Sequence, residues 1–150
     1  MKEAAVYQSR RLNARAQRWL IVDDEADLSA LLTECLAQLG LARVQGFHSP
    51  EEALAAFAAH PASVDLVVTD RDMPGIEGLE LARRMRARSP RVKVVLVSAN
   101  IDGITDAQLR AAGIAAVVAK PFSLFRLEAV VRAVTCEPAT DETYVAVRAA

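Results

Sequence analysis

Hydrophobic positions alternate between two kinds of spacing along residues 19–135. Residues 19–22 form a short apolar run that ends in acids, and the next apolar positions recur every three or four residues as far as Leu39, before Gly40. A run followed by such spacing predicts a β-strand and then an α-helix. The unit recurs, with strands at 42–47, 64–69, 92–98 and 115–119 and helices at 51–59, 79–87, 106–112 and 124–134. We therefore expect five βα units.

The predicted strands are apolar on successive residues. Residues 66–68 and 94–97 show no alternation of polar and apolar side chains. Continuous apolar strands indicate burial on both faces, which is typical of a parallel sheet covered by helices. With right-handed crossovers, the chain is expected to be a doubly wound α/β domain whose chemistry lies at the carboxyl ends of its strands.

Two predicted helices carry recognisable start signals. Ser49, Pro50 and Glu52 combine an N-cap serine, a proline at the first helical position and a capping-box glutamate. Thr105 and Gln108 repeat the capping pattern less strongly. These signals support helices that begin after residues 49 and 105.

Composition supports one folded domain with flanking arms. The 150 residues are 53% hydrophobic and only 5% aromatic, so the core must come mainly from aliphatic side chains. Residues 1–17 and 136–150 lie outside the repeating units and are expected to be arms around a domain at 18–135.

Charge and hydropathy exclude several classes of partner. The net charge of -1 gives no global attraction to nucleic acid or to an anionic membrane. No apolar run approaches the length of about 20 residues that spans a bilayer, and the basic N-terminus lacks the apolar region of a signal peptide. We expect a cytoplasmic protein that binds neither DNA nor membranes.

Polar groups follow four of the predicted strands. Several carboxylates at one sheet edge repel one another and raise their own pKa values unless a cation lies among them. Oxygen ligands with room for water suit Mg²⁺, and Mn²⁺ is expected to substitute for it. A carboxylate beside a cation, a lysine and a hydroxyl can accept a phosphoryl group. The residues in question are Asp23, Asp24 and Glu25, then Asp70, Ser98 and Lys120.

Four segments together resemble the signatures of response-regulator receiver domains of bacterial two-component systems. They are Ile-Val-Asp-Asp-Glu at 21–25, Val-Thr-Asp-Arg-Asp-Met-Pro-Gly at 68–75, Val-Ser-Ala at 97–99 and Ala-Lys-Pro-Phe at 119–122. Each is weak alone, but four in order at strand ends are specific. The resemblance covers about residues 18–135 and implies a flavodoxin-like, CheY-like sheet with strand order 2-1-3-4-5.

The resemblance also implies a role for each acid. Asp70 would be the phosphoacceptor and Asp24 a direct ligand of Mg²⁺, while Asp23 would act largely through water. The backbone carbonyl of Asp72 would be a further ligand. Asp24 could instead be an ordinary helix cap, and Asp70 a turn acid; the four-part match favours the metal and phosphoacceptor roles.

The remaining implied roles concern the phosphoryl group and its source. Ser98 and Lys120 would hold the phosphoryl oxygens. The donor would be a phosphohistidine on a sensor histidine kinase or a histidine phosphotransfer protein. The chain would then be a signalling domain that promotes only its own phosphorylation and dephosphorylation, rather than an enzyme with a separate substrate.

The chain departs from the receiver pattern at one output position. Receivers usually carry Tyr or Phe three residues before the lysine, where this sequence has Val117. An altered output switch is expected, with signalling through protein contacts on residues 104–134. The resemblance is to a single-domain regulator, and the sequence leaves homodimerisation open.

Two other functions compete with this interpretation. One is a degenerate receiver that serves as a phosphorylation-independent interaction module, which Val117 mildly favours. The other is a phosphatase of the haloacid dehalogenase type, because Asp70-Arg71-Asp72 imitates its nucleophile motif. Pro74 stands where that family expects Thr or Val, which argues against a phosphatase.

Overall fold

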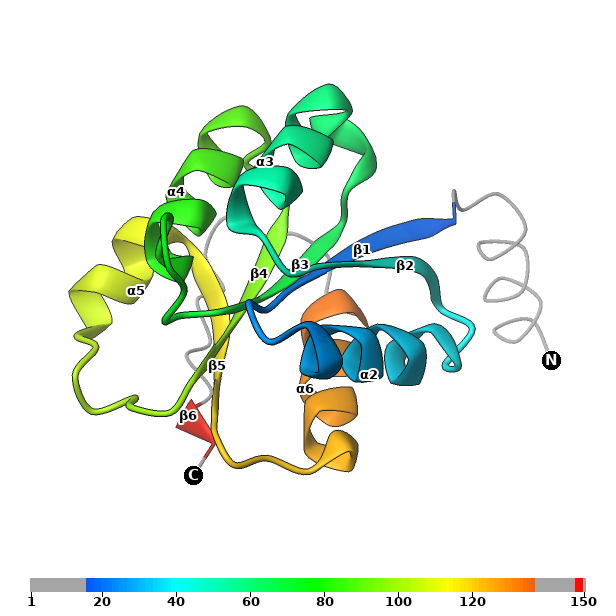
Figure 1. Ribbon diagram of the computed structural model, residues 1–150. Helices are drawn as coiled ribbons and strands as arrows, with labels where there is room; N and C mark the ends of the chain where they lie inside the picture. Colours follow the sequence, from blue (N-terminus) through cyan, green and yellow to red (C-terminus); the bar gives the residue numbers. More distant parts are fainter. Residues whose placement is uncertain (1–15, 137–147, 150) are drawn as a thin grey trace, which may run out of the picture.

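The computed structural model describes residues 16–136 and 148–149, and its elements alternate between strand and helix (Figure 1). The strands are β1 (Gln17–Val22), β2 (Ala42–Phe47), β3 (Leu66–Asp70), β4 (Lys93–Ser98), β5 (Ile114–Ala119) and β6 (Arg148–Ala149). The helices are α2 (Ala26–Ala37), α3 (Pro50–Ala59), α4 (Gly78–Arg88), α5 (Asp106–Ala112) and α6 (Leu124–Cys136), with a 3-10 turn, η1, at Pro61–Ser63.

The strands form one parallel sheet in the order β2-β1-β3-β4-β5-β6. The order of its first five strands confirms the predicted 2-1-3-4-5 arrangement. Two residues of β6 pair with Val117 and Val118 of β5, and this short sixth strand was not predicted. Residues 136–150 were expected to be an arm because they lie outside the repeating βα units. A strand of two residues is too short to show a periodicity that would reveal it. Of the arm predicted at 1–17, residues 1–15 lie outside the described residues, and Gln17 is the first residue of β1.

The two faces of the sheet pack against different helices. Along β1, Leu20 and Val22 join the core beneath α3, α4 and α5, while Trp19 and Ile21 join the core beneath α2 and α6 (Figure 1). All four side chains are at most 1% exposed. The predicted burial of the central strands on both faces is thus confirmed.

Both predicted caps form, but with different completeness. The Ser49 hydroxyl accepts a hydrogen bond from the Glu52 amide at 3.3 Å. Thr105 and Gln108 form the full reciprocal capping box, in which each side chain bonds the other residue's backbone amide. The weaker sequence signal therefore marks the better capped helix, α5.

A glycine lets α4 begin against the end of β3. The Gly78 amide donates to the Arg71 carbonyl at 2.8 Å. A Cβ at position 78 would collide with the carbonyl oxygen of Asp70. Because glycine has no Cβ, helix α4 can start beside the strand end where Asp70 lies.

No helix in the described part of the chain is long and apolar enough to cross a membrane. This finding agrees with the absence of a long apolar run in the sequence.

Two phenylalanines provide a test of this packing. Phe57 in α3 is fully buried, whereas Phe125 in α6 is 81% exposed. Phe57→Ala is expected to lower the free energy of unfolding by about 3–5 kcal/mol, because it removes contacts and leaves a cavity. Phe125→Ala should change it by less than about 0.5 kcal/mol. Urea unfolding of both variants measures the difference, and equal losses would contradict this assignment of core and surface.

Candidate functional site

Four polar residues meet at the carboxyl edge of the sheet because their strands are parallel. Asp70 is the last residue of β3 and Ser98 is the last residue of β4, while Asp23 follows β1 directly and Lys120 follows β5. The strands β1 and β3 are neighbours, with Val22 paired to Thr69, so Asp23 and Asp70 lie side by side. The predicted convergence of strand ends is therefore present.

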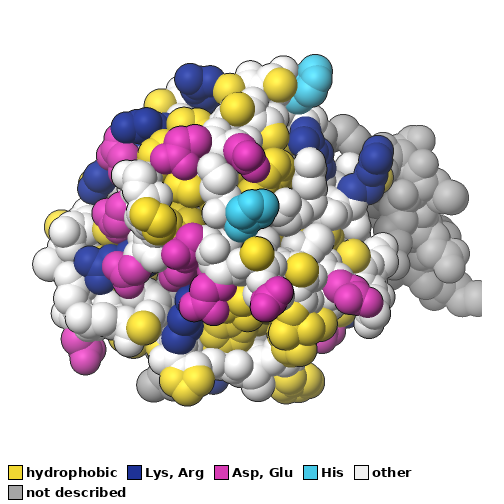
Figure 2. Space-filling view, in the orientation of Figure 1, with side chains coloured by type: hydrophobic (Ala, Val, Ile, Leu, Met, Phe, Trp, Pro, Cys, Tyr) yellow, Lys and Arg dark blue, Asp and Glu magenta, His cyan; other side chains and the backbone are white. Residues whose placement is uncertain are grey.

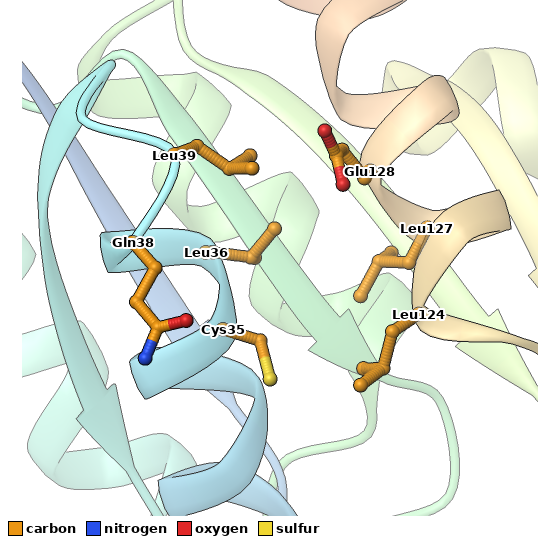
Figure 3. Close-up of a pocket in the computed structure, with 7 residues that line it drawn as sticks. All are labelled: Cys35, Leu36, Gln38, Leu39, Leu124, Leu127 and Glu128. Carbon is orange, nitrogen blue, oxygen red and sulfur yellow. The ribbon is translucent and has the colours of Figure 1, made fainter.

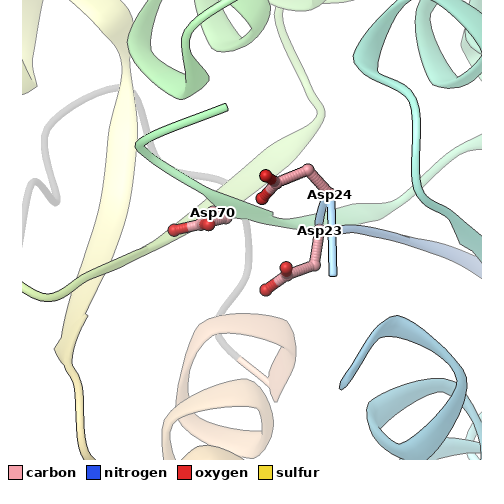
Figure 4. Close-up of side chains that lie close together, drawn as sticks. All are labelled: Asp23, Asp24 and Asp70. Atoms are coloured by element: carbon pink, nitrogen blue, oxygen red, sulfur yellow. The ribbon is translucent and has the colours of Figure 1, made fainter. Parts of the chain in front are cut away.

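Three carboxylates form a compact cluster at this edge. Asp23 and Asp24 extend from the segment after β1 and Asp70 from the end of β3 (Figure 4). One carboxylate oxygen from each lies within 4.8 Å of the others. Asp23 and Asp70 are buried, whereas Asp24 is exposed. Acidic side chains also gather across the middle of the face shown in the space-filling view (Figure 2).

One lysine neutralises part of this negative charge. The Lys120 Nζ lies 3.6 Å from Asp23 Oδ2 and 3.4 Å from Asp70 Oδ1. Burial raises the pKa of Asp70 despite Lys120, and the Asp23 charge adds to the rise. Burial likewise raises the pKa of Asp23, although the Glu25 amide and Lys120 oppose the increase. Lys120 therefore neutralises only part of the negative charge of the three acids.

For the pKa of Lys120, the neighbouring charges outweigh burial. Burial disfavours the charged ammonium of Lys120, but the Asp23 and Asp70 carboxylates outweigh burial and raise its pKa. Lys120 is thus held as a cation against two acids. The peptide bond from Lys120 to Pro121 is cis.

The cluster fits a hard divalent cation. Its donors are carboxylate oxygens that lie close enough to share one ion, and the exposed Asp24 leaves one side open to water. Mg²⁺ prefers oxygen ligands and retains several waters, so such a half-open acidic edge suits it. Asp72 is exposed in the loop after β3 and its side chain is not part of this cluster; the role of its backbone carbonyl stays a prediction.

Ser98 lies at the same edge, but its hydroxyl is bonded elsewhere. The side chain is fully buried, and its Oγ accepts a hydrogen bond from the Asn100 amide at 3.2 Å. Within the described residues, no hydrogen bond joins Ser98 to any of the three acids. The structure therefore brings Asp23, Asp24, Asp70 and Lys120 together, with Ser98 turned toward the loop after β4.

Arg71 has contacts that the sequence analysis did not predict. Its guanidinium Nη1 donates to the Asn100 carbonyl at 3.1 Å, and its Nε lies 3.6 Å from Glu77 Oε1. The bonded residues are 29 positions apart, so no local pattern indicates the contact. An arginine directly after a strand-end acid was the only signal that the sequence offered.

Val117 occupies the output position where an aromatic residue was expected from the receiver pattern. It lies in β5 and is only 4% exposed, within the core under α3, α4 and α5. Its aliphatic side chain is thus a packed core residue.

A pocket lies apart from the three acids, between α2 and α6 (Figure 3). Its volume is about 360 Å³, and Leu36, Leu39, Leu124 and Leu127 form its apolar wall. It shares no lining residue with the acidic cluster.

Comparison with known proteins gives a consistent family. The profile of the response regulator receiver domain matches residues 19–132. The probable chemotaxis protein CheY of Rhizobium etli is 29% identical over 117 residues, which cover 77% of this chain and 89% of that protein. The C4-dicarboxylate transport transcriptional regulatory protein DctD of Rhizobium meliloti is 35% identical over 107 residues. That match covers 71% of this chain but only 23% of DctD, so the chain spans a minor part of this longer relative.

Solved structures agree with the profile. The response regulator TrrA from Thermotoga maritima, solved in complex with Mg(2+)-BeF, is 34% identical and superposes with a TM-score of 0.68. That match covers 79% of this chain and 98% of TrrA. A receiver domain protein from Clostridium thermocellum superposes with a TM-score of 0.72 at 22% identity, over 80% of this chain and 94% of that one. With the profile covering most of its length, this chain belongs to the response regulator receiver domain family.

Proposed function

We propose that this chain is a phosphoacceptor signalling domain in which Asp70 receives a phosphoryl group in a Mg²⁺-dependent reaction. The donor in this proposal is a phosphohistidine on a sensor histidine kinase or on a histidine phosphotransfer protein. The observation that carries the proposal is the buried Asp70 carboxylate, which lies within 4.8 Å of the Asp23 and Asp24 oxygens and 3.4 Å from Lys120.

The ion would be held by the Asp24 and Asp70 carboxylates and the backbone carbonyl of Asp72, with Asp23 acting largely through water. When bound, Mg²⁺ supplies positive charge that offsets the acids and the phosphoryl oxygens. Mn²⁺ would substitute, because it accepts the same oxygen ligands. Three clustered acids with a single lysine support this assignment.

Asp70 acts as the nucleophile in this proposal. One carboxylate oxygen forms a bond to phosphorus while the bond from phosphorus to the donor imidazole nitrogen breaks, and the imidazole keeps that electron pair. The product is an acyl phosphate on Asp70. Lys120, already 3.4 Å from Asp70 Oδ1, is placed to pair with a phosphoryl oxygen. Ser98 would donate its hydroxyl hydrogen to another oxygen after turning from the Asn100 amide.

The signal would leave through protein contacts on residues 104–134, within a domain at 18–135 that acts in the cytoplasm without binding DNA. Formation of a homodimer is a further candidate output. The buried Val117 indicates that this output works without an inward-turning aromatic side chain. The complete set of acids with Lys120 argues against a silent interaction module.

Phosphorylation is tested by intact-protein mass after incubation with acetyl phosphate and Mg²⁺. The wild type is expected to gain one phosphate-sized increment, and only when Mg²⁺ is present. Asp70→Asn should gain none, because an amide is a poor nucleophile for phosphorus. Asp102→Asn, the same change at an exposed acid of the loop after β4, should behave as the wild type. No increment in the wild type, with acetyl phosphate or with a phosphorylated kinase, would refute the proposal.

The electrostatics of the cluster predict how metal and charge affect stability. Mg²⁺ that binds only the folded chain should raise the free energy of unfolding, by about 2.7 kcal/mol at a concentration one hundred times its Kd. Asp70→Asn should reduce this increment, because it removes one charged ligand. Thermal unfolding across a Mg²⁺ titration measures both effects. An equal gain in wild type and variant would show that the ion binds elsewhere.

The same variant has a pH dependence without metal. The pKa of Asp70 is raised in the folded chain by burial, so its ionised form destabilises the fold at neutral pH. Asp70→Asn is therefore expected to unfold at a higher temperature than the wild type at neutral pH. This advantage should disappear as the pH falls through the raised pKa and below the ordinary value of 3.8, where Asp70 is protonated in both states. An advantage that persists unchanged at low pH would contradict the assignment.

A further inference from the structure

Arg71 joins the two loops that flank the phosphoacceptor. It follows Asp70 directly and begins the loop of residues 71–77, between β3 and α4. Its Nη1 donates to the Asn100 carbonyl in the loop of residues 99–105, between β4 and α5. Its Nε is buried, has no hydrogen-bond partner among the residues that the structure describes, and lies 3.6 Å from Glu77 Oε1. Only 20% of the Arg71 side chain is exposed, although the bond from Nη1 to Asn100 lies at the surface.

The backbone of Asn100 carries this contact to Ser98. The Asn100 amide donates to the Ser98 hydroxyl oxygen at 3.2 Å, while the Asn100 carbonyl accepts from Arg71 at 3.1 Å. The Asn100 side chain also accepts from the Gly103 amide at 3.3 Å, which closes the loop on itself. The residue that orients the Ser98 hydroxyl is thus held from its other side by Arg71.

We infer that Arg71 is a positioning residue that holds the Ser98 hydroxyl in a resting orientation and so limits the rate at which Asp70 is phosphorylated. This inference rests on the proposed function. The Ser98 hydroxyl uses only its oxygen in the bond from Asn100, so its hydrogen is free, but a rotation of the side chain toward a phosphoryl oxygen would carry Oγ away from the Asn100 amide and break this bond. If the Asn100 amide stays in place while the loop of residues 99–105 moves slightly, its bond to Ser98 Oγ persists and opposes this rotation. Arg71 favours such retention, because hydrogen bonds from a charged donor are stronger than neutral ones.

The Glu77 contact alone does not explain how Arg71 is held. Glu77 is 44% exposed, and ion pairs of exposed groups contribute little. The bond from Arg71 to Asn100 also lies at the surface, but it holds a loop residue whose amide donates to the fully buried Ser98 hydroxyl. Loss of Arg71 should therefore change the behaviour of Ser98 more than the stability of α4.

The direct test is a double-mutant cycle between positions 71 and 98. Arg71→Met keeps the unbranched apolar stem of the side chain and removes its donors. Uptake of phosphate from acetyl phosphate with Mg²⁺, followed by intact mass against time, should be faster than in the wild type by about three- to tenfold, the factor expected for one lost hydrogen bond. In a Ser98→Ala background the same change should have no effect. Arg84→Met, at an exposed arginine paired with Glu80, is the matched control and should leave the rate unchanged.

An effect of the same size in both backgrounds would overturn the inference, because Arg71 would then act through its charge and not through Ser98. A wild type that takes up phosphate at the same rate as Arg71→Met would overturn it as well. A wild type that takes up no phosphate contradicts the proposed function itself, and this is seen before any variant is compared.

A second measurement does not depend on phosphorylation. Amide hydrogen exchange at Asn100 and Gly103 should be about three- to tenfold faster in unphosphorylated Arg71→Met, because the loop loses its anchor. Arg84→Met should leave both amides unchanged. Unchanged exchange in Arg71→Met would show that Arg71 does not hold the loop, and would overturn the inference.

Discussion

The repulsion among Asp23, Asp24 and Asp70 is the constraint around which the carboxyl edge of the sheet is arranged. Burial raises the pKa of two of these acids, and a single lysine offsets only part of the cost. Such a cluster persists only where the rest of the fold imposes it. Here the parallel strands hold the three acids together, because two hydrophobic cores, one on each face of the sheet, fix the positions of the strand ends.

Because the cores lie on both faces, the site and its surroundings are supported from different directions. The core under α3, α4 and α5 includes Val117 and Ile104, and so reaches the loop that carries Asn100. The other core, under α2 and α6, includes Ile21 of β1 and Leu32 of α2, the elements that precede and follow Asp23 and Asp24. Both cores reach the site, because Val22, directly before Asp23, belongs to the first and Val97, directly before Ser98, belongs to the second.

Most of the fold could be predicted from local patterns. Continuous apolar runs identified the five main strands, and the predicted bounds of α5, 106–112, are those of the structure. The acids could be found because parallel strands bring their carboxyl ends to one edge. The orientation of Ser98 and the contact of Arg71 with Asn100 could not, since they depend on side-chain rotamers and on residues 29 positions apart. The strand β6 has only two residues, too few for any periodicity.

The close approach of Gly78 to the carbonyl of Asp70 has a mechanical consequence. Where two backbones touch without an intervening side chain, no rotamer can absorb a displacement of one relative to the other. The first turn of α4 is thus joined to the end of β3 by main-chain contacts alone. A displacement of Asp70 would therefore act on the start of α4 before any side chain rearranges.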